Sequence, residues 1–103
     1  MVSVLSQIKY IAHKITPHNG KVILYGSRAR GDAGDNSDWD LLIVLDKDRL
    51  EQSDYDDVSF PFVMLGSELG QVINPIMYTA KEWNLYSSTP FYKNVVHDGI
   101  NII

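Results

Sequence analysis

The sequence contains no cysteine, which excludes disulfide bonds and thiolate metal sites. It also has no long apolar run, because polar residues such as Gln7, Lys9 and His13 interrupt the N-terminal segment, and no run approaches the roughly 20 residues that span a membrane. Basic residues are few, with 9 Lys and Arg against 13 Asp and Glu and a net charge of −4. General nucleic-acid binders carry basic tracts that neutralise phosphates, and this chain has none. We therefore expect a cytoplasmic protein with no membrane segment and no general binding to DNA or RNA.

Neither repeats nor linkers divide the 103 residues, so we expect residues 1–103 to form a single domain. Hydrophobic periodicity and turn residues predict helices over 2–16, within 48–69 and over 90–97, and strands over 21–25, 39–45 and 72–78. Pro75 lacks a backbone donor, which indicates an edge strand or a bulge. The order of these elements predicts an α/β fold, a small mixed β-sheet flanked by helices.

The most informative segment runs from Gly26 to Asp40. Gly26 and Ser27 directly follow the apolar run 22–25, and Asp38-Trp39-Asp40 opens the next apolar run after ten intervening residues. Successive strand side chains point to opposite faces, so Asp38 and Asp40 share one face. Two neighbouring carboxylates repel each other unless a cation lies between them, and Mg²⁺ combines such oxygen ligands with substrate phosphates. The pattern predicts a site for a metal ion and a nucleotide.

This pattern resembles the signature of the nucleotidyltransferase fold of the DNA polymerase beta superfamily, which is Gly-Ser, ten residues and then Asp-x-Asp. In length the chain is similar to its minimal nucleotidyltransferases, and the resemblance implies transfer of a nucleoside monophosphate, AMP from ATP, to an acceptor hydroxyl. It implies Asp38 and Asp40 as the catalytic and metal-binding residues, with two Mg²⁺ ions when the nucleotide is bound. It also implies an antitoxin-like role in which the partner is a helical ribonuclease toxin.

The turn before Asp38 has the composition of a phosphate site. Gly26 has no side chain, so a phosphate can approach its backbone closely. Ser27 supplies a hydroxyl at the expected start of a helical turn, where free N–H groups favour anions. Arg28 and Arg30 are the basic residues within reach of a phosphate, and an arginine can bind one with two parallel hydrogen bonds. We assign nucleotide binding to Gly26, Ser27 and Arg30.

The chain departs from the superfamily pattern at the third carboxylate, which active members carry on a later strand. The corresponding strand here, 72–78, contains no acid. Val72 or Asn74 occupies the expected position, and the Asn74 amide cannot accept a proton as a base. Glu68, just before this strand, is the other candidate. Three interpretations follow: a nucleotidyltransferase, a catalytically impaired nucleotide-binding or toxin-neutralising subunit, and an unrelated α/β interaction domain.

The segment 46–57 is strongly acidic, with six acids and two bases. A solvated helix face or loop accounts for this composition, and the alternative is a docking surface for a basic partner.

Overall fold

Four strands form one mixed sheet in the order β3-β2-β1-β4 in the computed structural model, which describes residues 3–103. The helices and strands are α1 (Val4–Ile15), β1 (Lys21–Tyr25), α2 (Ser27–Arg30), β2 (Trp39–Leu45), α3 (Gln52–Asp54), η1 (Tyr55–Ser59), α4 (Phe60–Leu69), β3 (Ile73–Thr79), α5 (Ala80–Leu85), α6 (Pro90–Asp98) and β4 (Ile100–Asn101). β2 is antiparallel to β1 and parallel to β3, and β4 is antiparallel to β1. The predicted α/β class is confirmed. Residue 2, where the first helix was expected to begin, lies outside the described residues.

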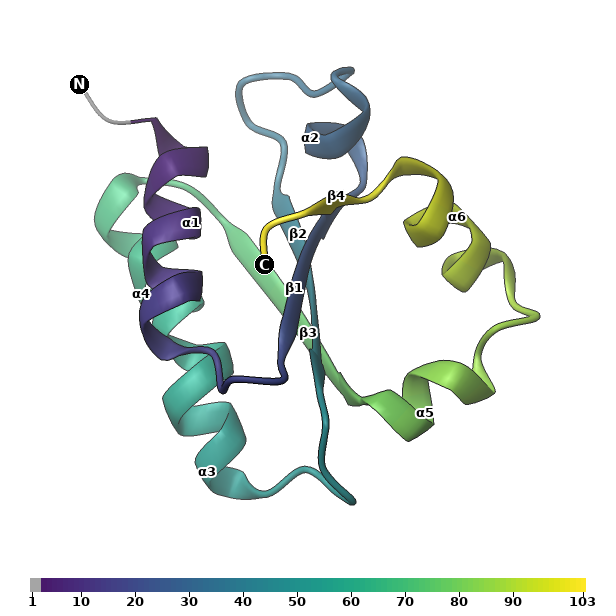
Figure 1. The fold of residues 1–103 in the computed structure, drawn as a ribbon. Coiled ribbons are helices and arrows are strands. Elements are labelled where there is room, and N and C mark those ends of the chain that lie inside the picture. Colours follow the sequence, from purple (N-terminus) through teal and green to yellow (C-terminus); the bar gives the residue numbers. More distant parts are fainter. Residues whose placement is uncertain (1–2) are drawn as a thin grey trace.

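Helices cover both faces of the sheet (Figure 1). α1, α3 and α4 lie on one side, and α5 and α6 lie on the other. Strand alternation produces this division, since Leu41 and Ile43 of β2 belong to the core cluster under α1 and α4. Leu42 and Val44 belong to the second cluster, with Trp83 of α5 and Val95 of α6. Asp40 has the same parity as Leu42, so it lies on the α5/α6 face.

The helical segment between β2 and β3 is one run from Gln52 to Leu69 with a π-helical turn in its middle. The π turn ends where Phe60 donates its N–H to the carbonyl of Tyr55. Pro61 follows at once, and because it has no N–H, it does not continue an α-helical ladder from the preceding turn. Gly70 ends α4 in the left-handed conformation with φ 67°. The run therefore begins before Pro61, and the proline marks its irregular turn.

β3 is an edge strand, as Pro75 predicted, because only β2 pairs with it. The sequence pattern missed β4, whose two residues pair with Ile23 and Leu24 of β1. A strand of two residues is too short to show alternation, and tertiary pairing alone defines it. Among residues 3–103, no helix has the length and apolar character needed to cross a membrane.

Candidate active site

The turn between β1 and α2 is built on a glycine that no other residue could replace without strain. Gly26 has φ 76° and ψ −159°, a conformation that is essentially reserved for glycine. Its carbonyl accepts hydrogen bonds from the N–H groups of Ala29 and Arg30 at 3.0 and 3.1 Å. The N–H groups of Ser27 and Arg28 come before these in α2 and have no carbonyl of an earlier helical turn to bond. Ser27 is half-buried, with its hydroxyl at the start of the helical turn.

Gly26 also lies directly against the acid pair. A Cβ atom at this position would be only 2.5 Å from Oδ2 of Asp40. Tyr25, Asp40 and Asn74 are aligned across β1, β2 and β3 in the strand register. The Gly-Ser turn and the acidic motif thus meet at one end of the sheet, although ten residues separate Ser27 from Asp38 in the chain.

Asn74 occupies the position expected for the third carboxylate. Its amide nitrogen donates a hydrogen bond to Oδ2 of Asp38 at 2.8 Å. Val72, the other candidate, precedes the strand, and its carbonyl accepts the N–H of Trp39. Glu68 is exposed on α4, a helix that packs on the opposite face of the sheet from Asp40. The third position near the acid pair is therefore a neutral amide.

Two carboxylates fit a magnesium ion that completes its coordination with phosphate oxygens, because Mg²⁺ binds through one or two carboxylates plus substrate. Asp38 is exposed and Asp40 is half-buried, so neither is sealed from an incoming ligand. A site made of three or more His, Cys, Asp or Glu side chains is absent from residues 3–103. The donor set therefore fits an ion that arrives with its substrate better than an ion held by the protein alone.

Tyr25 is a residue of this region that the sequence analysis did not select. Burial and the nearby Asp40 carboxylate raise the pKa of Tyr25 to about 12. Its ring packs edge-on against Phe91 of α6, with centroids 5.4 Å apart. The phenol therefore stays protonated near neutral pH and can donate a hydrogen bond, but it cannot serve as a base. The sequence indicated its position only through strand alternation. Tyr25 lies two residues after Ile23, so both side chains point to the α5/α6 face of the sheet.

Arg28 organises the loop that carries the chain from α2 to Asp38. Its guanidinium donates hydrogen bonds to the carbonyls of Ser37 at 3.0 and 3.3 Å and of Asp35 at 3.2 Å. It also lies over the ring of Trp39, 4.5 Å from the centroid. These contacts explain how an irregular loop delivers the acidic motif to the start of β2.

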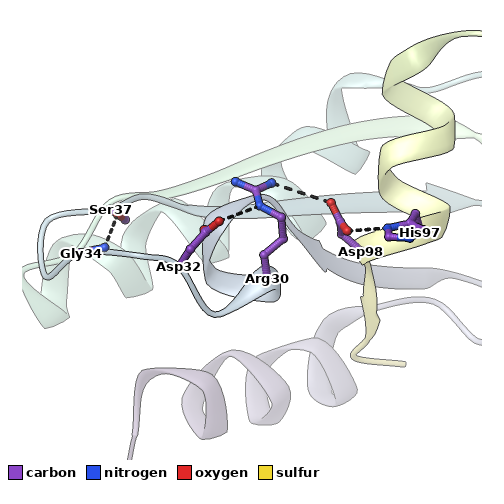
Figure 2. Close-up of polar contacts among 6 residues, drawn as sticks. All are labelled: Arg30, Asp32, Gly34, Ser37, His97 and Asp98. Carbon is purple, nitrogen blue, oxygen red and sulfur yellow. Dashed lines mark hydrogen bonds and ion pairs between the residues drawn. The ribbon is translucent and has the colours of Figure 1, made fainter.

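Arg30 lies between two carboxylates (Figure 2). Nε contacts Oδ2 of Asp32 at 3.1 Å, and Nη1 lies 3.8 Å from Oδ2 of Asp98 at the end of α6. The side chain remains 45% exposed. These contacts engage Nε and Nη1, so a phosphate would meet Nη2 or compete with a carboxylate. The assignment of Arg30 to nucleotide binding stays a prediction. No sequence signal connected Arg30 with Asp98, which is 68 positions further along the chain.

A mixed sheet with a Gly-Ser turn after one strand and Asp-x-Asp at the start of the next defines a protein of the nucleotidyltransferase fold. The pattern of the nucleotidyltransferase domain family matches residues 5–89. The chain belongs to this family, which confirms the resemblance seen in the sequence and indicates a transferase.

The chain is also similar to a curated protein from Methanocaldococcus jannaschii that bears the name "Putative protein adenylyltransferase". The two are 38% identical over 79 residues, which cover 77% of this chain and 73% of the relative. The name of this relative describes a transferase, in agreement with the family.

Solved structures share the fold, and two of them come from toxin–antitoxin systems. One is a toxin–antitoxin crystal structure with AMP-PNP, with a TM-score of 0.68 and 20% identity. The other is a mutant of the toxin–antitoxin pair MntA-HpeT, with a TM-score of 0.64 and 18% identity. Each match covers 98% of this chain and 73% of the other chain. At this identity they support the architecture, and the nucleotidyltransferase fold is thereby confirmed.

Proposed function

We propose that this chain transfers AMP from Mg²⁺-bound ATP to a hydroxyl group of an acceptor protein. The observation that carries the proposal is the close approach of the Gly26 turn to Asp40, which brings the start of α2 and the acid pair to the same end of the sheet. Asp38 and Asp40 would hold magnesium, which when bound would neutralise charge that develops on the phosphate oxygens. The relative's name supports a protein as acceptor. We further propose that this protein is a helical ribonuclease toxin, and the toxin–antitoxin titles of the structural neighbours fit a toxin partner.

Each residue of the site has a distinct role in this proposal. The N–H groups of Ser27 and Arg28 and the Ser27 hydroxyl donate to the terminal phosphates. Asp38 and Asp40 would be the ligands of the expected magnesium ions, two of them when the nucleotide is bound. Arg30 stabilises the departing pyrophosphate with its remaining donors. Tyr25 keeps its proton and supports Asp40 from the side of β1.

Within residues 3–103, the third position beside the acid pair gives the acceptor hydroxyl no base, because Asn74 occupies it. A carboxylate at position 74 could accept the acceptor proton, whereas the Asn74 amide donates to Asp38. A positioned general base contributes about 10²–10⁴-fold to a rate. We therefore expect slow transfer. The same observation favours the second candidate function, a nucleotide-binding or toxin-neutralising subunit without chemistry.

The test measures transfer of AMP from α-labelled ATP to the protein encoded by the neighbouring gene, together with calorimetry of ATP binding. We expect Mg²⁺-dependent ATP binding in the wild type and its loss in Asp38→Asn. We expect slow wild-type transfer and at least tenfold faster transfer in Asn74→Asp, which restores an acid. If the wild type and Asn74→Asp both bind ATP but neither transfers AMP, the second candidate function is favoured. ATP affinity that is the same with and without Mg²⁺ would refute the metal assignment.

A further inference from the structure

The outer side of α4 and the residue just before β3 expose four apolar side chains, which we call the α4 face. Phe60, Val63, Met64 and Val72 are 54%, 42%, 44% and 55% exposed. The three on α4 are spaced i, i+3 and i+4 and form one stripe, while Phe62 and Leu65 of the same helix are buried in the core. The core therefore does not use this stripe, and a contiguous exposed apolar surface of this kind marks an interaction site.

The exposed charges on the chain segment that carries the α4 face have a single sign. Residues 50–80 contain five acids and no Lys, Arg or His. Asp54 is buried and pairs with Lys47 at 2.8 Å, so it does not face a partner. The other four acids are exposed, and they are Glu51, Asp56, Asp57 and Glu68. The α4 face is therefore an apolar stripe on a segment whose exposed charges are all negative.

A hollow at the edge of β3 borders the α4 face and includes Asn74 in its lining. It has a volume of about 340 Å³, and its lining includes Val63, Ser67, Val72 and Asn74. Asn74 is the residue that donates to Asp38. A protein that covers the α4 face and enters this hollow therefore reaches the neighbourhood of the acid pair.

The edge of β3 favours contact through side chains over the addition of a strand. The carbonyl of Val72, just before β3, accepts the N–H of Trp39, so every second residue that follows Val72 directs its backbone groups toward β2. The backbone of Pro75 then faces the open edge, where it offers no N–H donor. A pairing strand would lose a hydrogen bond in the middle of this edge.

We propose that the α4 face is the docking surface for the acceptor protein, and that the acceptor presents apolar side chains flanked by Lys or Arg. Complementary charge steers association and disfavours partners of the same sign. A second copy bound through the same segment would oppose exposed charges of the same sign, so the symmetric dimer is disfavoured. The orientation of the acceptor hydroxyl toward Asp38 rests on the proposed function, whereas the docking surface itself does not require it.

The first test measures docking without nucleotide. The probe is a fluorescently labelled amphipathic helical peptide of leucine and lysine, and the control peptide replaces lysine with glutamate. We expect the lysine peptide to bind the wild type and the glutamate peptide not to bind. Val63→Ser with Met64→Ser should weaken binding at least tenfold. The matched control, Leu85→Ser with Val96→Ser, removes apolar side chains that are 77% and 66% exposed on the opposite layer and should bind as the wild type does.

Two further variants, each of which removes two carboxylates, complete this test. Asp56→Asn with Asp57→Asn should weaken binding of the lysine peptide at least tenfold. Asp46→Asn with Asp48→Asn changes the net charge equally at exposed positions outside the α4 face and should have little effect. Circular dichroism checks that each variant is folded. Equal weakening in both charge variants would overturn the proposal, because binding would then depend on net charge alone.

The second test locates the peptide directly. The chain has no cysteine, so one engineered thiol can carry a photo-crosslinker at a single site. A crosslinker at Ser67→Cys, in the hollow, should capture the lysine peptide, and one at Ser87→Cys, on the α5–α6 connection, should not. Capture only at position 87 would overturn the proposal. Wild-type self-association that Val63→Ser with Met64→Ser abolishes would also overturn it, since the occupant would be a second copy. ATP calorimetry on the same variants separates a failure of docking from a failure of the proposed function.

Discussion

Replacing Gly26 with alanine tests the contact on which the proposed site depends. The backbone there has φ 76° and ψ −159°, and a side chain in this region costs about 1–3 kcal/mol of strain. The added methyl would also lie 2.5 Å from Oδ2 of Asp40, so the carboxylate must move away. We expect Gly26→Ala to lower the free energy of unfolding by at least the strain term, and to weaken Mg²⁺–ATP binding at least tenfold, or about 1.4 kcal/mol.

Gly70→Ala is the matched control for backbone strain. Gly70 has φ 67°, and a Cβ there would meet nothing within 4 Å. A left-handed alanine costs about 1–2 kcal/mol, so this variant should lose stability in urea denaturation while its affinity for Mg²⁺–ATP stays at the wild-type value. The comparison separates general destabilisation from damage to the site.

A double-mutant cycle isolates the clash itself. In an Asp40→Ala background the offending oxygen is absent, and the Cβ atom of residue 40 remains at 3.6 Å, an ordinary contact. Gly26→Ala should then cost less stability than in the wild type, and the difference is the coupling between the two residues. The reasoning is refuted if folded Gly26→Ala binds Mg²⁺–ATP as tightly as the wild type, or if the coupling is zero.

Two further predictions concern residues that support the fold around the site. Lys47 and the N–H of Glu51 hold the pKa of Asp54 below its ordinary value of 3.8, so its stabilisation is complete above that pH and is lost as pH falls through the lowered pKa. Asp54→Asn should lower stability by about 1–3 kcal/mol at pH 7 and converge with the wild type in acid, measured by urea denaturation against pH, with Asp56→Asn as the exposed control. Arg28→Lys should destabilise the chain by about 1–3 kcal/mol in thermal melts, because an ammonium cannot reproduce the forked bonds to Ser37 and Asp35. Wild-type stability in Arg28→Lys would show that charge alone holds the loop.

Local sequence was sufficient to predict an element wherever a single segment contains the residues that define it. The bounds of β1 and β2 follow from apolar runs that end at Gly26 and begin after Asp38, and the structure has them as predicted. Thr89 and Pro90 begin α6 because a capping hydroxyl and a fixed φ favour a helix start wherever they occur. The spacing from Ser27 to Asp38 identified the candidate site for a similar reason. Two strands joined by a short connection lie side by side, so the end of the first and the start of the second are close together.

Tertiary structure decided what depends on residues that are distant in sequence. Asn74 became the neighbour of Asp38 only through the parallel pairing of β2 with β3, 36 positions apart. β4 forms because it pairs with a free edge of β1, and two residues are too few to predict a strand from sequence alone. Arg30 acquired Asp98 as a partner because α6 ends beside α2. The acidic composition of 46–57 was visible in the chain, but only folding brought Val72 beside Val63 of α4, since burial selects which side of a helix remains exposed.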